Sequence, residues 1–339
     1  MTVGHGCSTW KRSGKTRMFE SLDRSRFRGE LVGVATGGTS SEREISLKTG
    51  AAFAEALRSL DYDVRVYDVA TDLPAILAER PAAMVLGIHG GAGESGVLQG
   101  MLELFEIPYT GSGVLASALA MDKARSKIIC ADAGVPVAAG RIFRGEELRD
   151  EARLVAEIGA LGFPVVVKLN DSGSSVGVEL CRDEGALQSA VATLTRQVSE
   201  ATTAGLLAEA YLEGPEYSVG FFDDECLGTM QIVPDAEFYD FEAKYESQST
   251  AYHLVTDEDL RGPMEEWARR ALRALGCRGV ARVDFKGDVV GGGAAMLEVN
   301  TIPGMTATSL VPKLAGHRGM SFEEFVEAML VSARLESGA

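Results

Sequence analysis

The chain has 339 residues, of which 46% are hydrophobic and 24% charged, and its formal net charge is −16 at pH 7. This length predicts two or three domains, and the negative charge disfavours nucleic acids and membrane surfaces as partners because both are rich in phosphate. The sequence has no apolar run near the roughly 20 residues of a membrane-spanning helix.

The first 29 residues differ in composition from the rest of the chain. Seven lysines and arginines occur there against two acidic residues, Glu20 and Asp23. No apolar segment follows them, which excludes a secretory signal. Gly14-Lys15-Thr16 resembles the end of a phosphate-binding P-loop, but Thr9 stands where that motif needs glycine. We therefore predict a disordered, poorly packed extension over residues 1–29.

Strands and helices alternate over residues 30–118. Apolar or alternating runs predict strands at 31–36, 63–69 and 83–88, and helical spacing follows from about Ser46 and again over 97–105. This order predicts a doubly wound parallel sheet, whose ligands gather at the carboxyl ends of its strands. Gly37-Gly38 and His89-Gly90-Gly91 both fall at such ends.

From about residue 119 onward the pattern becomes α+β. The predicted strands are 164–168, 176–180, 206–209, 216–222, 280–285 and 295–299, and the predicted helices are 183–198 and 264–275. The short loop between the first two strands indicates a hairpin. Residues 235–252 form a long polar and aromatic segment, which is typical of a loop that closes over a ligand.

Polar residues alternate along the last two predicted strands. Glu298 and Asn300 are two residues apart and therefore share one strand face, as do Arg282 and Asp284 on the neighbouring strand. Two carboxylates and an amide oxygen suit Mg²⁺. A salt bridge between arginine and a carboxylate across the strands is the alternative. The turn that follows favours the functional reading, because Gly304 lets backbone N–H groups approach an oxyanion.

Three other positions have both a functional and a purely structural interpretation. Lys168 ends a strand before a hydroxyl-rich loop, which suits a phosphate site or a plain hairpin turn. Glu42 either binds a substrate ammonium or belongs to a helix-capping sequence. His89 either faces a ligand or is a hydrogen-bonded core histidine.

Seven motifs in chain order resemble those of the D-alanine–D-alanine ligase family of ATP-grasp enzymes. They are Gly37–Ser46, His89–Gly100, Pro108–Gly113, Met121–Lys127, Gly173–Gly177, Tyr239–Tyr245 and Glu298–Thr306. The likeness implies an N-terminal doubly wound substrate-binding domain over 30–118, followed by two ATP-grasp subdomains that clamp ATP, a lid over 119–212 and a catalytic subdomain over 213–339.

The resemblance also implies the chemistry. ATP would phosphorylate the carboxylate of one D-alanine, and the amine of a second D-alanine would displace the phosphate, giving D-alanyl-D-alanine for peptidoglycan synthesis. Two Mg²⁺ ions, replaceable by Mn²⁺, would bridge the phosphates. We expect a cytoplasmic homodimer with no nucleic-acid or membrane partner. The scattered cysteines are typical of free thiols in a reducing compartment.

The family's functional residues map onto this sequence by motif position. ATP contacts are expected from Lys123, Lys168, Glu209, Leu212, Glu216 and Lys244. Metal ligands are expected at Asp284, Glu298 and Asn300. The first D-alanine would meet Glu42, Ser174, Tyr245 and His89, the oxyanion would meet Arg282 and Gly304, and the second carboxylate would meet Ser309 and Leu310.

Five departures from the family pattern occur, at Ser95, Leu169, Asp171, Ala210 and Phe241. None removes a residue assigned to the chemical steps. A ligase that joins D-alanine to D-lactate is an alternative, although members accepting a hydroxy acid generally lack the tyrosine that is present here in Lys244-Tyr245. A ligase for another amino-acid pair and a non-catalytic ATP-binding relative are further alternatives.

Overall fold

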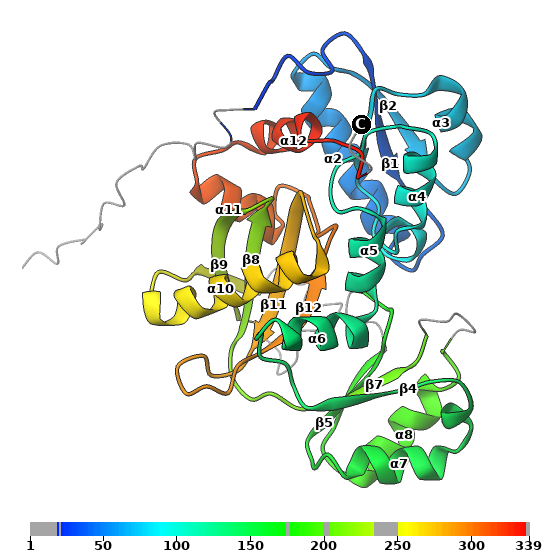
Figure 1. Ribbon diagram of the computed structural model, residues 1–339, viewed down its shortest axis with the longest axis vertical. Helices are drawn as coiled ribbons and strands as arrows, with labels where there is room; N and C mark the ends of the chain where they lie inside the picture. The colour runs from blue at the N-terminus through cyan, green and yellow to red at the C-terminus, as the bar shows by residue number, and fades with distance from the viewer. Residues whose placement is uncertain (1–18, 20–21, 174–176, 199–203, 234–249, 337–339) are drawn as a thin grey trace, which may run out of the picture.

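The structure is a computed structural model that describes residues 19, 22–173, 177–198, 204–233 and 250–336. Three sheets, stacked along the long axis of the molecule, organise these residues (Figure 1). The N-terminal sheet has the order β2-β1-β3, the middle sheet β10-β9-β8-β11-β12, and the remaining sheet β4-β7-β5-β6.

The N-terminal sheet is parallel and covered on both faces. Its strands are β1 (Leu31–Thr36), β2 (Asp63–Asp68) and β3 (Ala83–Leu86). Val32 and Val34 face one side, where helices α2 (Arg43–Ser59) and α12 (Phe322–Val331) pack. Tyr67 and Met84 face the other side, which is covered by α3 (Leu73–Glu79) and α4 (Val97–Leu104). The predicted doubly wound sheet is confirmed, with its second layer completed by the last helix of the chain.

The sheet farthest from the N-terminal sheet is antiparallel and has helices on one face only. It contains β4 (Gly140–Phe143), β5 (Val165–Leu169), β6 (Val178–Cys181) and β7 (Leu206–Ala210). Helices α7 (Glu151–Gly159) and α8 (Glu184–Leu194) bury one face. We call this sheet and its two helices the lid. The pairing of β5 with β6 confirms the predicted hairpin.

The middle sheet is also antiparallel. Its strands are β8 (Glu216–Phe222), β9 (Glu225–Val233), β10 (Ala251–Leu254), β11 (Val280–Lys286) and β12 (Ala295–Asn300). Helix α10 (Glu258–Leu275) covers one face, together with α5 (Val114–Met121) and α6 (Lys123–Asp132). Helix α11 (Leu310–His317) packs on β8 and β9.

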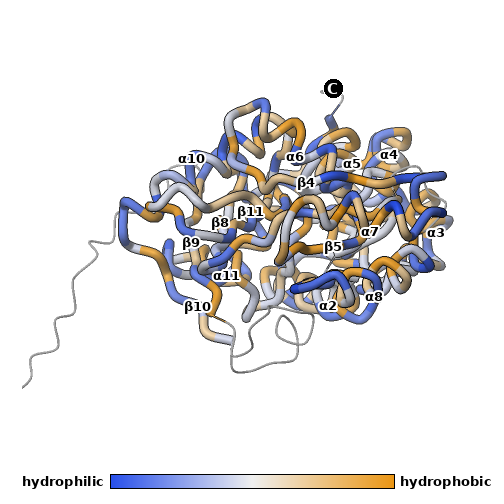
Figure 2. Tube along the Cα trace, turned by 90° about the horizontal axis from the view of Figure 1, so that it is seen from below, coloured by the Kyte–Doolittle hydropathy of each residue, from blue (hydrophilic) through white to orange (hydrophobic). Residues whose placement is uncertain are grey.

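Strand alternation gives the middle sheet two unlike faces. Val283 and Phe285 are fully buried under α10, with Leu272 of that helix in the same cluster. Arg282 and Asp284 alternate with them along β11 and therefore point to the opposite face. Figure 2 shows the corresponding mixture of hydrophobic and hydrophilic residues along the helices that cover the sheets. The apolar face packs against the helices, and the polar face is available to line a ligand site.

Most predicted elements are present with shifted ends, and the missed ones range from the four-residue strands β4 and β10 to the ten-residue helices α6 and α12. Sequence reasoning did not predict α3, α5, α6, α7, α11, α12, β4, β9 or β10. No helix in the described part of the chain combines the length and the apolar composition needed to cross a bilayer. Cys130, Cys181, Cys226 and Cys277 are free, as expected, and Cys7 lies outside the described residues.

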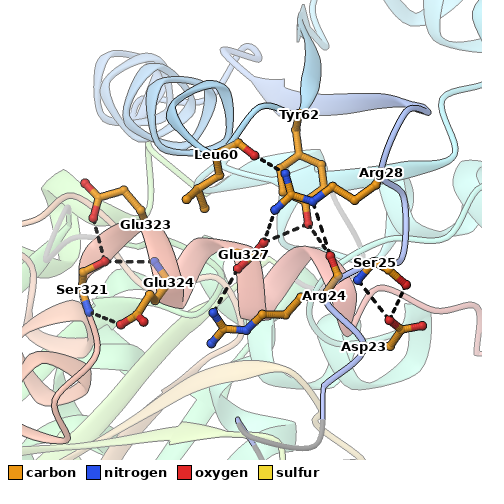
Figure 3. A network of polar contacts seen from close by, with 10 residues as sticks. All are labelled: Asp23, Arg24, Ser25, Arg28, Leu60, Tyr62, Ser321, Glu323, Glu324 and Glu327. Carbon is orange, nitrogen blue, oxygen red and sulfur yellow. Dashed lines mark hydrogen bonds and ion pairs between the residues drawn. The ribbon is translucent and has the colours of Figure 1, made fainter.

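The prediction of a poorly packed N-terminal extension is wrong for its last part. Phe19 is 2% exposed and stacks near Phe222, with 5.2 Å between ring centroids. Residues 22–29 run along α12 (Figure 3), where Arg26 donates to the Val331 carbonyl over 2.8 Å. The sequence composition showed that this segment is basic. It did not show that two of its arginines pair with a buried acid.

That acid is Glu327 of α12, which is 3% exposed. Its carboxylate lies 2.7 Å from Arg28 Nη2 and 3.5 Å from an Arg24 nitrogen, and it accepts a 3.1 Å hydrogen bond from the Tyr62 hydroxyl (Figure 3). Burial and the Glu327 charge raise the pKa of Tyr62 to about 12. The contacts tie the N-terminal segment to both α2 and α12, and we call Arg24, Arg28, Tyr62 and Glu327 the N-terminal clasp.

Replacing Arg28 by alanine is expected to lower the free energy of unfolding by roughly 1–2 kcal/mol, because Glu327 stays buried with fewer cationic partners. Denaturant unfolding measures the change. Arg273→Ala is the matched control: its partner Asp224 is 82% exposed, so the loss should stay within about 0.5 kcal/mol. Equal losses in the two variants would remove the clasp from the account of stability.

Candidate active site

A cleft of about 820 Å³ separates the open face of the lid from the polar face of the middle sheet. From the lid side and α6 it is lined by Lys123, Lys168 and Glu209, and from the middle sheet by Glu216, Asp284 and Glu298. Tyr211 and Leu212 line the connection between the two sheets. The cleft therefore brings together positions that are up to 175 residues apart in sequence (123 to 298).

Buried lysines dominate the lid side of the cleft. Lys168 Nζ lies 2.6 Å from Glu209 Oε2, and Lys127 contacts the other oxygen of the same carboxylate. Burial would raise the pKa of Glu209, but the two lysine charges outweigh it and the net shift is downward. Lys123 Nζ donates to the Ser172 carbonyl over 2.6 Å and lies 3.4 Å from Glu298 Oε2.

Lys127, which contacts the cleft residue Glu209 from behind, is a residue that sequence reasoning missed. Burial and the neighbouring Lys168 charge lower its pKa to about 8. Lys123 and Lys127 are four residues apart on α6, so they share one face of the helix. That spacing is visible in the sequence and is the signal that could have identified Lys127. An excess of positive charge at this end suits a polyanionic ligand.

Asp284 is the most densely bonded side chain of the middle sheet. It is 4% exposed and accepts hydrogen bonds from Ser218 Oγ at 2.6 Å, Arg282 Nη2 at 2.9 Å and Asn300 Nδ2 at 3.1 Å. The register of β11 and β12 pairs Asp284 with Glu298 and Arg282 with Asn300. The alternative ion pair thus exists, but Arg282 pairs with Asp284 along the same strand and not across strands.

These side chains fit a hard divalent cation only in company with other ligands. No three histidine, cysteine or acidic side chains among the described residues converge on one point. Asp284 and Glu298 supply carboxylate oxygens and Asn300 an amide oxygen, from directly paired strands. Mg²⁺ commonly takes only one or two protein carboxylates and completes its shell with water and substrate phosphates. The donor set is therefore suited to a metal that arrives with a phosphate.

A second cavity, of about 1290 Å³, adjoins the other end of the same sheet face. Arg282, Gly304, Ser309 and Leu310 line it, and Asp284 lines both this cavity and the cleft. Ser309 precedes α11 and accepts a 3.1 Å hydrogen bond from the Thr306 backbone N–H. Two ligands, one in the cleft and one in this cavity, would thus come together at Asp284.

Glu42 inserts its carboxylate between two glycine-containing loops. A Cβ atom at Gly90 would lie 2.7 Å from Glu42 Oε2, and one at Gly173 would lie 2.5 Å from it, so side chains at either glycine would collide with the carboxylate. Glu42 is the residue before α2, but its side chain makes no capping hydrogen bond. The alternative, a capping box of a serine with a glutamate three residues later, is therefore wrong, because the residue before α2 is Glu42 and not a serine.

Glu94 lies near Glu42 and was not singled out in the sequence. Burial, reinforced by the Glu42 charge, raises the pKa of Glu94 to about 8, and its carboxylate accepts a 2.8 Å hydrogen bond from the Gly90 backbone N–H. Ser95, a departure from the family pattern, follows it. The two acids make this end of the site receptive to an ammonium group.

His89 is both buried and fully hydrogen-bonded, as its structural interpretation predicted. Its Nε2 lies 2.9 Å from Thr49 Oγ1 and its Nδ1 lies 3.0 Å from the Ile302 carbonyl. Burial, with a smaller contribution from the Arg282 charge, lowers the pKa of His89 to about 4. Through these contacts a neutral His89 fixes the turn after β12, which carries Gly304, against α2.

The structure brings most of the expected site residues together in these two cavities, with Glu42 and His89 buried in the N-terminal domain. Ser174, Lys244 and Tyr245 lie outside the described residues. Leu169, another departure from the family pattern, is buried in the lid core at 8% exposure, where a Cβ atom at Gly177 would approach within 2.7 Å of it.

His89 is expected to make stability fall in acid. The unfolded state binds a proton near pH 6.5 and the folded state only near pH 4, so stability is fully present above pH 6.5 and decreases as pH falls to 4. Between pH 7 and pH 4.5 the loss should be roughly 2–3 kcal/mol. Denaturant unfolding of the wild type and His89→Gln at both pH values measures it. Equal pH slopes in the two proteins would contradict the assignment.

Comparison with known proteins assigns the family. Residues 129–331 match the family model described as "D-ala D-ala ligase C-terminus". A D-alanine–D-alanine ligase of Geobacter sulfurreducens is 43% identical over 320 residues, covering 93% of this chain and 98% of that protein.

Solved structures agree with this assignment. A Bacillus anthracis D-alanine–D-alanine ligase superposes with a TM-score of 0.76 at 31% identity, covering 88% of this chain and 96% of that one. The same enzyme complexed with ATP gives a TM-score of 0.73 at 29% identity, with the same coverage. The fold is therefore the ATP-grasp fold, and the chain belongs to the D-alanine–D-alanine ligase family.

Proposed function

We propose that this member of the family joins two D-alanine molecules to D-alanyl-D-alanine, a peptidoglycan precursor, with ATP converted to ADP and phosphate. The observation that carries the proposal is the shared wall: Asp284 lines both the lysine-bearing cleft and the cavity of Arg282 and Ser309. A triphosphate in the first and an amino acid in the second would meet at that carboxylate. The relatives' names and the ATP complex of the Bacillus anthracis enzyme support the choice of substrates.

ATP would occupy the cleft between the lid and the middle sheet. Lys123 and Lys168 would bind phosphate oxygens, and Lys244 would reach the transferred group. Glu209, in β7, and Leu212, in the connection that follows β7, would bind adenine, and Glu216 would bind the ribose. The contacts of Lys127 and Lys168 with the single carboxylate of Glu209 support this placement. One carboxylate compensates only one of the two lysine charges, which leaves positive charge for a nucleotide.

Asp284, Glu298 and Asn300 would hold two Mg²⁺ ions, for which Mn²⁺ could substitute, and the ions would neutralise charge on the β- and γ-phosphates when bound. The donor types and the direct pairing of β11 with β12 support this assignment. The ion pair of Arg282 with Asp284 orients both side chains.

The amino-acid cavity would bind both D-alanines. Glu42 would pair with the first ammonium, with Ser174 and Tyr245 completing a hydrogen-bonded set and His89 lying nearby. The first carboxylate would attack the γ-phosphorus, and the second amine would then attack the resulting acyl carbon. Arg282 and the Gly304 N–H would stabilise the oxyanion, and Ser309 with the Leu310 N–H would bind the second carboxylate.

Phosphate release from ATP should require both D-alanine and Mg²⁺. Arg282→Ala should lower kcat by roughly 10²–10³ because it removes an oxyanion donor. Arg269→Ala, on the outer surface of α10, is the control and should keep the wild-type rate. A coupled ADP assay with D-alanine, D-serine and D-lactate measures both points. Turnover only with another pair would refute the substrate, and a normal rate in Arg282→Ala would refute the role of that arginine.

We propose in addition that the protein is a homodimer. Large apolar side chains are exposed on neighbouring helices α4 and α5, where Val97 is 65% exposed, Leu104 83% and Leu115 65%. Such a group on one face favours burial against a second copy.

Leu104→Glu should convert the dimer to a monomer in sedimentation velocity runs. Val290→Glu, in the turn between β11 and β12, is the matched control because Val290 is 70% exposed but lies elsewhere, and it should leave the dimer intact. A wild type that sediments as a monomer would refute the dimer. A Leu104→Glu variant that remains dimeric would refute this interface.

A further inference from the structure

The N-terminus of helix α6 borders the ATP cleft but has no backbone N–H group to spare. Its first three N–H groups belong to Lys123, Ala124 and Arg125. They donate to the Asn170 carbonyl at 3.3 Å, to Asn170 Oδ1 at 2.9 Å and to Asp122 Oδ1 at 3.0 Å. A helix N-terminus is ordinarily a ready site for phosphate. Here the Asp122 side chain and both the backbone carbonyl and the side chain of Asn170 accept these bonds, so phosphate recognition falls to the lysine side chains.

Asp122 joins three separate segments. Its carboxylate is 1% exposed and caps α6. Arg144, which follows β4 of the lid, donates to both oxygens at 3.0 and 3.1 Å. Asn170 Nδ2, which follows β5, donates at 2.9 Å. Because opposite charge and hydrogen bonds converge on one buried carboxylate, the lid and α6 are fixed to each other at this point.

Asn170 makes the closest link to the expected phosphate contacts. It is fully buried, and its own backbone N–H donates to the Gly205 carbonyl, anchoring it to β7. It lies two residues after Lys168 and two before Ser172, whose carbonyl binds Lys123 Nζ. One side-chain amide therefore sets the start of α6 against the end of β5, and with them Lys123 against Lys168. Asn170 lies within the sequence stretch that departs from the family pattern.

We infer that Asp122 and Asn170 are positioning residues for ATP: their amide–carboxylate bond fixes the spacing of Lys123 and Lys168 so that both can bind one triphosphate. The inference rests on the proposed function for the identity of the ligand. Neither residue needs to touch the nucleotide. Loss of the bond should weaken ATP binding more than D-alanine binding, because the cavity lined by Arg282 and Ser309 contains no residue of α6 or of the lid, and the loop after Asn170 approaches the D-alanine site only at Gly173, beside Glu42.

The first test is Asn170→Ala. It removes the two side-chain hydrogen bonds, to the Ala124 N–H and to Asp122, so the KM for ATP and the calorimetric Kd for ATP without D-alanine should both rise by about tenfold. The KM for D-alanine should stay within twofold of the wild type. Arg125→Ala is the matched control, because Arg125 Nη1 also bonds the Asp122 carboxylate, at 2.5 Å, but from within α6 itself. It should leave the affinity for ATP unchanged.

A charge swap tests the bond independently of Asn170→Ala. Asn170→Asp alone places two carboxylates at hydrogen-bond distance and should weaken ATP binding further. The double variant Asp122→Asn with Asn170→Asp restores one amide facing one carboxylate and should recover most of the lost affinity. Melting temperatures of all four variants show whether each remains folded.

The outcomes separate this inference from the proposed function. Unchanged ATP affinity in Asn170→Ala, a parallel rise in the KM values for ATP and D-alanine, or a folded swap variant that binds ATP no better than Asn170→Asp would each overturn the positioning role. A wild type that binds ATP but releases no phosphate with D-alanine would instead overturn the proposed substrates, and the comparison of ATP affinities would still hold.

Discussion

The site depends above all on strand alternation in the middle sheet. Every second residue of β11 is committed to the core under α10, so Arg282 and Asp284 between them must face the cleft. The antiparallel register then places Glu298 and Asn300 beside them. A shift of one residue would bury the charges and expose the core, which would cost far more than any single hydrogen bond. The chemistry is thus positioned by the same packing that stabilises the sheet.

The sequence was sufficient for this part of the molecule because period-two alternation is a local property. Glu298, Asn300, Arg282 and Asp284 could be placed on one face from spacing alone, and the family motifs supplied the lysines. Burial depends on distant partners, which local patterns do not reveal. Lys127 was missed because its partner Glu209 is 82 residues away, and Glu327 because its arginines are about 300 residues away. The basic N-terminal composition suggested disorder, whereas a buried acid makes part of it packed.

The two walls of the cleft differ in the charged groups that they carry. On the lid side, Lys127 and Lys168 share one carboxylate, so this wall is electropositive before any ligand arrives. On the sheet side, the buried carboxylate of Asp284 is surrounded by hydrogen-bond donors, including Arg282. His89 is held neutral at the far end. This arrangement lets a chain with a net charge of −16 bind a polyanion through a locally positive surface.

The position of α12 bears on how the chain folds during synthesis. The face of the N-terminal sheet formed by Val32 and Val34 is closed by residues of α12, including Phe325 and Leu330. Those residues are synthesised about 290 residues after Val34 (34 to 325), so the first sheet emerges with one apolar face bare and stays so until α12 follows. Nascent chains that lack α12 therefore expose an apolar surface of the kind that chaperones bind. A protein truncated before residue 322 would lack the helix that covers one face of its N-terminal sheet.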